Sequence, residues 1–409
     1  MTASRRASTR QSGRRRLLLG GLCMAGLGAA APSAADTGSV SLAACGGRPG
    51  SGRAELIGAF ARAFELLRSA GGGVLDIAPG AYDFGRQAED ASIIQVEGLH
   101  DVRIRAHGAL FQLDTAASVT PCLFYFVNPV NIVFEGASFR DAGYDPRLNW
   151  RGMVCVRVEA TIPVRGFALT QCAVDGAVAL LQCHQHGRNK FLARGIRVQG
   201  TVRNAYYGVS LTYAGDGADL DLACENVRRG CMSYGLRNAT IRMRVKHARG
   251  QPASNGFISL ACEGASAGNV ENVQVMLEFT GPACHGSLVH FYHQQQERPG
   301  AIANVRAHVK LSGMQEGDGA LRVFLFDHEL PGGAVLRRTA RAWSGISLSG
   351  EISGRLHGRL LDNPSESTSP GSIRLDQVLS AHADLARLPA YFHGTARPRG
   401  TAVAERANG

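Results

Sequence analysis

Short runs rich in β-forming residues recur along most of this chain, and the repetition limits the folds that it can adopt. From about Ile93 onward no helical spacing of apolar residues appears. Instead, triplets whose first and third residues are apolar follow one another at intervals of 21 to 35 residues. These triplets begin at Val102, Ile132, Phe167, Ile196, Leu220, Ile241, Val273 and Val305. Such a repeat predicts a solenoid, because one coil is too small to bury its own apolar face and must stack on its neighbours.

An amphipathic helix is predicted for residues 53–70, ahead of the repeats. Its apolar residues lie three, four and seven positions apart; they are Leu56, Ile57, Phe60, Phe64 and Leu67. Three glycines, a short apolar segment and the Pro79-Gly80 turn before Tyr82 follow it. This order resembles the opening of the pectate-lyase-like β-helix superfamily. The resemblance implies an all-β protein, a right-handed parallel β-helix solenoid with an N-terminal capping α-helix.

A β-sandwich or jelly roll is the competing architecture. It needs a hairpin turn about every 8 to 12 residues, and Asn255-Gly256 is the one clear turn of that kind. The β-helix is therefore favoured. We expect a single β-helix domain over residues 36–384, after an export signal in residues 1–35 and before a loosely held tail in residues 385–409.

The first 35 residues have the pattern of an export signal. They contain six arginines and no acidic residue, followed by the apolar run from Leu17 to Leu27 and a stretch of small residues. Arg14-Arg15-Arg16 before Leu17-Leu18 resembles the twin-arginine signal, which carries folded proteins across the bacterial inner membrane. The apolar run has 11 residues, whereas a membrane span needs roughly 20. The sequence therefore predicts a periplasmic or secreted protein without stable membrane insertion.

The net charge of +11 depends strongly on this signal. Without it the chain has 38 basic and 33 acidic residues, or about +5. A mildly basic surface favours capture of an acidic polymer, whereas nucleic-acid binding needs concentrated basic patches. The sequence therefore indicates a polysaccharide partner and no nucleic acid.

Nine of the ten cysteines would remain after cleavage of the signal. None belongs to a CxxC pair or to a zinc-like spacing. Those inside apolar runs are Cys155, Cys172, Cys183, Cys224 and Cys262. We expect these to be small buried packing residues. A disulfide joining Cys224 to Cys231 or Cys262 is the alternative.

Polar and aromatic residues recur where each predicted strand ends before a variable loop. Aligning the coils on these ends gives one column, which contains Asn128, Glu159, His184, Tyr213, Tyr234, Glu263, His293 and His328. Strand alternation predicts that Val156 and Val158 point inward and that Arg157 and Glu159 point outward. A groove along such a column would suit a linear sugar chain.

The segment 182–190 has the densest cluster of ionisable side chains. His184 and His186 can exchange a proton near neutral pH, and Arg188 and Lys190 can neutralise a substrate carboxylate. The order His-Gly and Arg-x-Lys is similar to the polygalacturonase family of glycoside hydrolases. The aspartates that supply acid and base in that family have no counterpart upstream, so its mechanism is not carried over. A solvated basic loop is the alternative.

Two further clusters, around residues 285–294 and 326–329, add histidine, tyrosine and acidic groups. β-Elimination on a uronic-acid polymer needs a cation, a base and an acid, which Arg, His and Tyr can supply. Hydrolysis would need two carboxylates, for which Glu263 with Asp327 or Glu159 are candidates. The predicted catalytic residues are His184, His186, Tyr213, Tyr234, Glu263, His293 and Asp327. The predicted substrate-binding residues are Arg157, Glu159, Arg188, Lys190, Arg237, His290, Tyr292 and His328.

No cofactor is expected. An acidic stretch, formed by Asp216, Asp219, Asp221 and Glu225, has oxygen ligands for calcium, but its spacing fits no EF-hand and favours a solvated face. The sequence thus predicts an exported polysaccharide lyase. Three alternatives stay open: a glycoside hydrolase, a polymer-level epimerase, and a non-catalytic binding or export protein.

Overall fold

The computed structural model describes residues 38–148, 150–184, 193–212, 215–248, 256–263, 268–282, 286–294, 301–314, 321–329, 343–362, 373–382 and 392–394. The chain divides into two compact units, Met1–Ala35 and Asp36–Gly409. All the described residues belong to the second unit. None of its described helices is both long and apolar enough to cross a membrane.

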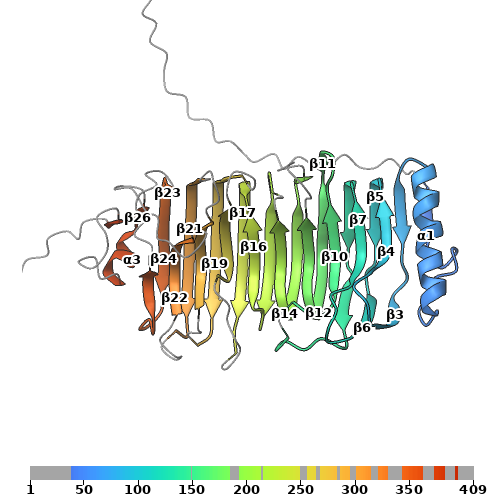
Figure 1. The fold of residues 1–409 in the computed structure, drawn as a ribbon, viewed down its shortest axis with the longest axis horizontal. Coiled ribbons are helices and arrows are strands. Elements are labelled where there is room, and N and C mark those ends of the chain that lie inside the picture. The colour runs from blue at the N-terminus through green and yellow to red at the C-terminus, as the bar shows by residue number, and fades with distance from the viewer. Residues whose placement is uncertain are drawn as a thin grey trace, which may run out of the picture. The chain divides into compact units, whose positions relative to one another are not determined.

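The second unit is an all-β, right-handed parallel β-helix, as predicted. Its strands pair in parallel with strands of the preceding and following coils, and Figure 1 shows them stacked in chain order along one axis. Three parallel sheets surround the interior. Long strands bend from one sheet into the next, so the hydrogen bonding is continuous between the sheets.

The first sheet carries the candidate site. It consists of β4 (Ser92–Glu97), β7 (Cys122–Val127), β10 (Val154–Glu159), the ends of β12 (Phe167–His184) and β14 (Arg197–Thr212), β16 (Arg229–Tyr234), β18 (Ile258–Glu263), β20 (Gly286–Gln294), β22 (Leu321–Glu329) and β25 (Arg359–Asp362).

The second sheet follows the predicted triplets. It consists of β1 (Ser39–Ser41), β2 (Gly73–Asp76), β5 (His100–Arg105), β8 (Val130–Glu135), the starts of β12 and β14, β15 (Asp219–Glu225), β17 (Leu236–Lys246), β19 (Val270–Thr280), β21 (Ile302–Ser312), β24 (Ile346–Ile352), β26 (Ile373–Leu375) and β27 (Phe392–Gly394). The pair β23 (Trp343–Ser344) and β21 extends its edge.

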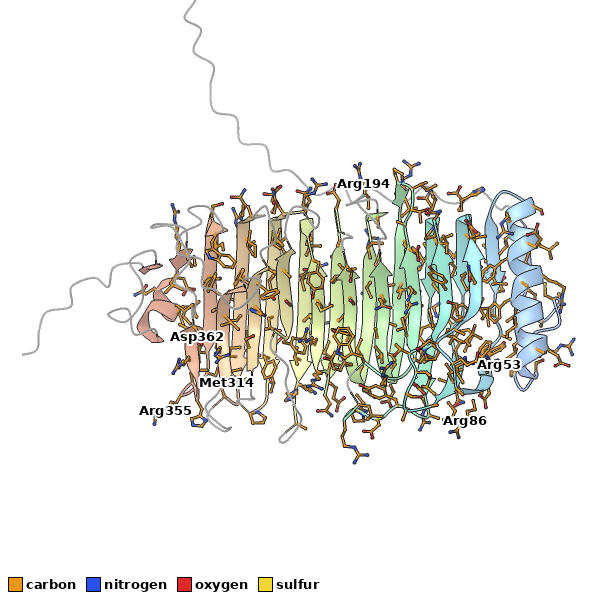
Figure 2. All side chains as sticks on the ribbon, viewed as in Figure 1. Arg53, Arg86, Arg194, Met314, Arg355 and Asp362 are labelled. Atoms are coloured by element: carbon orange, nitrogen blue, oxygen red, sulfur yellow. The ribbon has the colours of Figure 1, made fainter. Side chains whose placement is uncertain are left out.

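The third sheet begins with β3 (Gly80–Gln87), β6 (Ala109–Thr115) and β9 (Ser138–Asp141) and continues through the middle of β12 and β14. β11 (Val164–Arg165) and β13 (Ala193–Arg194) form a separate pair. In Figure 2, Arg194 lies at one edge of the stacked coils, and Arg86 and Arg355 lie at the opposite edge.

An asparagine ladder marks one corner of the coils. Asn238, Asn272 and Asn304 have φ between 51° and 56°, a left-handed conformation that asparagine tolerates better than most residues. Asn272 Nδ2 donates to Asn238 Oδ1 at 3.1 Å, and Asn304 Nδ2 donates to Asn272 Oδ1 at 3.3 Å. The ladder therefore repeats the same turn in successive coils and satisfies its amides between them.

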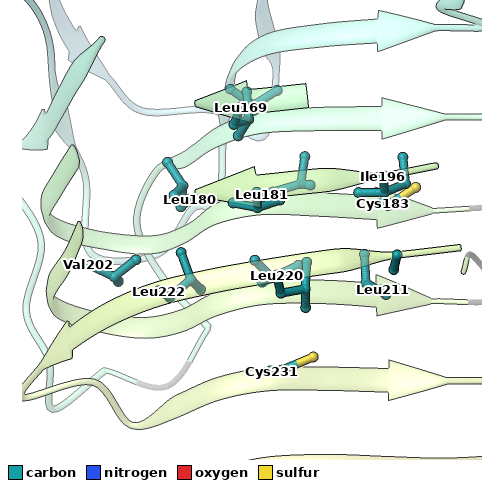
Figure 3. Packing of buried hydrophobic residues seen from close by; sticks show 14 of the residues in the cluster. Leu169, Leu180, Leu181, Cys183, Ile196, Val202, Leu211, Leu220, Leu222 and Cys231 are labelled. Carbon is teal, nitrogen blue, oxygen red and sulfur yellow. The ribbon is translucent and has the colours of Figure 1, made fainter. Parts of the chain in front are cut away.

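A helix and an aromatic cluster close the N-terminal end of the core. α1 (Arg53–Ser69) buries Leu56, Phe60, Phe64 and Leu67 against the first coils, and it lies beside them in Figure 1. Its predicted range, 53–70, is confirmed. Further along, Figure 3 shows Leu181, Leu211 and Leu220 packed inside consecutive coils.

All eight predicted triplets lie on the second sheet. The pairing places Val102, Ile132 and Phe167 level with one another. Two of the predicted alignments are shifted by two residues, because Val198 pairs with Leu220 and Ile241 pairs with Val275. A two-residue shift leaves the facing of each side chain unchanged. The sequence did not predict α3 (Gln377–His382). It also did not predict that β27, which lies within residues 385–409, pairs with β26.

Eight cysteines lie in the described residues, and all are buried. No disulfide joins these eight, so the alternative of a bond from Cys224 to Cys231 or Cys262 is wrong. Burial raises the pKa of Cys183, Cys224 and Cys231 to about 12. These thiols are therefore protonated at neutral pH, and the thiolate is the reactive form.

We expect these eight thiols to resist modification in the folded protein. A variant with Cys23→Ser and Cys284→Ser, the two positions outside the described residues, should release less than about one equivalent of thionitrobenzoate from Ellman's reagent at pH 8. In guanidinium chloride it should release eight, the number of described cysteines. Rapid reaction of several thiols without denaturant would contradict the packing.

Candidate functional site

The first sheet bends within each coil, and the bend turns a second row of side chains away from the main core. Two consecutive residues point into the main core at this bend, as with Leu123-Phe124 and Leu180-Leu181. The residues just before the bend then face outward, since side chains alternate along a strand. With Met232, which lies just after the bend, they form a second apolar cluster separate from the main core. Its other members are Cys122, Val154, Val178, Ala179, Tyr206 and Tyr207. Tyr125, Tyr144 and Tyr234 pack against it and are partly buried.

A loop between β9 and β10 covers part of this cluster. Asp141, at the end of β9, is buried and accepts hydrogen bonds from the backbone N–H groups of Thr115 at 3.0 Å and Met153 at 2.7 Å. It also accepts from the Thr115 hydroxyl and from the Gly143 N–H. One carboxylate therefore ties both ends of the loop to the neighbouring coil.

The loop places Trp150 over two tyrosines of β14. Its ring centroid lies 5.5 Å from that of Tyr206 and 5.3 Å from that of Tyr207, whose rings meet edge to face. Trp150 is 48% exposed, whereas both tyrosines are buried. We call Trp150, Tyr206 and Tyr207 the aromatic platform. It offers an exposed ring held by a rigid base.

Arginines lie over the tyrosines of the same surface. The guanidinium carbons of Arg228 and Arg229 lie 5.1 Å and 5.9 Å from the ring centroids of Tyr206 and Tyr207, respectively. Both distances are within the range of cation–π attraction. Arg229 Nη1 also contacts Met232 Sδ at 3.4 Å. The platform therefore combines apolar ring surface with positive charge.

A tyrosine–glutamate pair lies on the same face, in β7 and β10. The hydroxyl of Tyr125 donates a hydrogen bond to Glu159 Oε2. Burial, followed by this hydrogen bond, raises the pKa of Tyr125 well above its usual value near 10. The Arg157 guanidinium lies 5.9 Å from the Tyr125 ring centroid, and its Nε donates to Gln182 at 2.9 Å. We call Tyr125, Arg157 and Glu159 the polar triad.

The strand register corrects the predicted column. Continuous pairing places one row of Cα atoms through Val127, Glu159, His184, Thr212, Tyr234, Ala261, Tyr292 and Asp327. Asn128, His293 and His328 lie one residue beyond this row, and Glu263 lies two residues beyond it. Loops of different length offset the strand ends, so alignment on the ends misplaced these four residues.

The same register separates the predicted residues along the axis. Glu159 and Asp327 lie six strand steps apart, or about 29 Å, since neighbouring strands are about 4.8 Å apart. Glu159 and Glu263 lie four steps, about 19 Å, apart. Two carboxylates that cleave one glycosidic bond are about 5 to 9.5 Å apart. Glu159 and Glu263, one of the two predicted pairs, are therefore too widely separated to act together.

Several predicted residues lie wholly or partly outside the described part of the chain. His186, Arg188, Lys190 and Tyr213 lie outside the described residues. The side chains of His184, Glu263, His293, Asp327 and His328 also lie outside them, and only their backbone positions are described.

Other predicted residues lie away from the aromatic platform or beside it. Tyr234 packs against the second apolar cluster. His290 is buried in the row that includes Arg157, and its ring centroid is 5.2 Å from that of Tyr292. Arg237 lies past the corner at Gly235, where its Nη2 is 3.6 Å from Asp216 Oδ2. Arg237 therefore belongs to the second sheet.

The acidic stretch that offered calcium ligands contacts arginines instead. Asp216 lies 3.9 Å from Arg194, Asp221 lies 3.2 Å from Arg244, and Glu225 lies 3.2 Å from Arg203. Asp219 pairs with Arg242. The described residues contain no group of three or more acidic, histidine or cysteine side chains arranged to hold a metal ion.

Sequence reasoning missed the aromatic platform, Tyr125 and the two arginines over the platform. Tyr206-Tyr207 is the pair of adjacent tyrosines in the chain, and Trp150 is one of just two tryptophans. Both are signals for surface recognition. Their contact depends on the loop that Asp141 anchors, and no sequence spacing reveals that anchor.

No family model and no curated protein matches this chain. Several solved structures are similar to it, among them the following three. The ORF18 protein of Geobacillus virus E2 is 11% identical over 80% of this chain and 60% of that protein, with a TM-score of 0.45. The tailspike protein of E. coli bacteriophage HK620 is 11% identical over 78% of this chain and 58% of its own, with a TM-score of 0.43.

The third is the A-module of the mannuronan C-5 epimerase AlgE6 from Azotobacter vinelandii. It is 10% identical over 82% of this chain and 98% of the module, with a TM-score of 0.38. Identities and TM-scores this low assign neither a family nor an activity. The parallel β-helix is the class of protein that the coordinates define.

Proposed function

We propose that this protein binds an acidic polysaccharide across the outer face of the first sheet and cleaves it by β-elimination. The observation that carries the proposal is that arginines over tyrosines and the pair formed by Tyr125 and Glu159 lie on the same sheet. The export pattern of residues 1–35 supports a site of action outside the cytoplasm.

The aromatic platform suits the binding step. Sugar rings present apolar C–H faces that pack on aromatic rings, and Trp150 offers an exposed ring of this kind. The positive charge of the Arg228 and Arg229 guanidinium groups would attract a uronate carboxylate. An apolar sugar face and an acidic group are thus matched on one surface.

The polar triad suits the elimination step. Glu159 would take the proton at C5 of the uronate, Arg157 would stabilise the charge that develops on its carboxylate, and the C4–O bond would then break. Tyr125 would donate a proton to the departing oxygen, leaving a C4=C5 double bond. A tyrosine phenol is protonated at neutral pH at its ordinary pKa near 10, so Tyr125 has a proton to give. His184, level with Glu159 in the next coil, is an alternative base.

Hydrolysis has less support from the backbone geometry, since Glu159 and Glu263, one of the two predicted carboxylate pairs, are too far apart. The pair Glu263 and Asp327 stays as its remaining candidate. An epimerase would share the proton removal at C5 but would leave the chain intact.

The test is a panel of polygalacturonate, alginate, hyaluronan and neutral dextran, read by near-ultraviolet absorbance and by reducing ends. β-Elimination predicts both signals on an acidic polymer and neither on dextran. Reducing ends without absorbance would indicate hydrolysis, and neither signal on any polymer that binds would indicate a non-catalytic binding protein.

We expect Trp150→Ala to weaken binding of the acidic polymer by about 10- to 30-fold, since a central aromatic contact contributes about 1.4–2 kcal/mol. Isothermal titration calorimetry measures the effect. Leu66→Ala, which removes another exposed apolar side chain from α1, is the control and should bind like the wild type. If the wild type, Trp150→Ala and Leu66→Ala bind with equal affinity, the aromatic platform is not part of the binding site.

A further inference from the structure

The outer face of the second sheet changes its charge pattern along the axis. One row of paired residues runs through Arg197, Asp219, Thr240, Gln274, Arg306, Ser347 and Arg374. In the first coils arginines and carboxylates alternate and contact one another: Arg197 lies 3.9 Å from Asp219, and Arg203 lies 3.2 Å from Glu225. This part of the face is close to neutral.

In the later coils the same row contains two arginines and no carboxylate. Arg306 and Arg374 are both exposed. Within the described part of the chain, neither forms an ion pair. Ser347 separates them, so their Cα atoms lie two strand steps, or about 9.6 Å, apart. Two guanidinium groups at this spacing create a local positive field that no described neighbour in the row cancels.

These residues line a groove with a volume of about 590 Å³. Its other walls are Asn272, Val273, Gln274, Asn304, Gly345 and Ser347. Among these, Gln274 has an amide and Ser347 a hydroxyl, and both groups exchange hydrogen bonds with sugar hydroxyl groups. Met276, two residues beyond Gln274 on the same face, is 41% exposed and offers an apolar contact. The lining thus combines cations, hydrogen-bonding groups and apolar surface.

We propose that this groove is a second binding site for an anionic stretch of polysaccharide, separate from the site on the first sheet. The ligand class rests on the proposed function, whereas the charge and the groove do not. Arg306 and Arg374 each bind one acidic group of the chain, and the Gln274 amide and the Ser347 hydroxyl bind its hydroxyls. A second site would hold a long polymer near the protein while another segment occupies the first sheet.

The test is the double variant Arg306→Gln and Arg374→Gln. Its matched control is Arg197→Gln with Arg203→Gln, which removes the same charge from two arginines of β14 that face carboxylates. We expect the first variant to bind long polygalacturonate, alginate or hyaluronan about 10-fold more weakly, measured by affinity electrophoresis. The control should change by less than twofold. Turnover of a tetrasaccharide should be unchanged in both, because a short ligand needs the first sheet alone.

Equal weakening in both variants would show a general effect of net charge and overturn the proposal, as would wild-type affinity in the first variant. Trp150→Ala separates this result from the proposed function. If Trp150→Ala binds normally and no polymer is cleaved, but the double variant still loses affinity, the groove is a binding site and the proposed function fails. A wild-type protein that binds none of the three acidic polymers overturns both.

Discussion

Glu159→Gln is expected to lower turnover of the acidic polymer by about 10²- to 10⁴-fold, the contribution of a well-placed general base. Glutamine keeps the size of the side chain and can still accept the hydrogen bond from Tyr125, but it cannot take a proton. Binding should change by less than about threefold. The rate of absorbance increase at saturating polymer measures the effect.

Two companion variants make the result specific. Glu278→Gln, an exposed carboxylate of the second sheet, should retain full turnover. Tyr125→Phe should lose turnover by a comparable factor, since it removes the proposed acid. Unchanged turnover in Glu159→Gln would exclude this residue as the base and transfer that role to His184.

Phe111→Ala is expected to lower the free energy of unfolding by about 3 to 5 kcal/mol, the usual cost of removing a buried phenylalanine. The side chain is fully buried in β6. Its ring centroid lies 5.2–6.2 Å from those of Phe60, Tyr82, Phe124, Phe134 and Phe139. Because these rings come from α1 and from all three sheets, the cavity weakens the whole N-terminal end.

Guanidinium chloride unfolding followed by circular dichroism measures this loss. Phe111→Leu fills most of the space and should cost clearly less than the alanine variant. Leu66→Ala, at an exposed position of α1, should change the unfolding free energy by less than about 0.5 kcal/mol. A loss below about 1 kcal/mol for Phe111→Ala would contradict the aromatic packing.

The architecture could be predicted because the same physical constraint acts in every coil. Each triplet on the second sheet must place two apolar side chains inside and one residue outside, so its pattern survives variation in loop length. The helix Arg53–Ser69 could be predicted for a similar reason. Its apolar residues, which cover the end of the core, recur with the period of an α-helix. Errors of two residues in register did not affect these predictions.

The site depends on relations that the repeat does not record. Alignment on strand ends fails wherever loop lengths differ, which moved Glu263, His293 and His328 out of the true row. From the sequence, Tyr206 and Tyr207 look like ordinary strand residues. In the structure, the bend in the first sheet separates them from the main core. Arg157 and Glu159 were predicted to point outward, and both are partly exposed. Their partner Tyr125 is 34 residues before Glu159 and becomes adjacent through coil stacking.

Fluorescence of Trp150 tests the central claim most directly. The chain has two tryptophans, and Trp343 is fully buried, so a Trp343→Phe variant reports on the platform alone. The titrant is an acidic polymer whose binding has been established by calorimetry. We predict a saturable change in Trp150 emission and at least a threefold loss of iodide quenching. The dissociation constant from the fluorescence titration should equal the one from calorimetry. Binding that leaves both the emission and the quenching of Trp150 unchanged would contradict a sugar site on the first sheet.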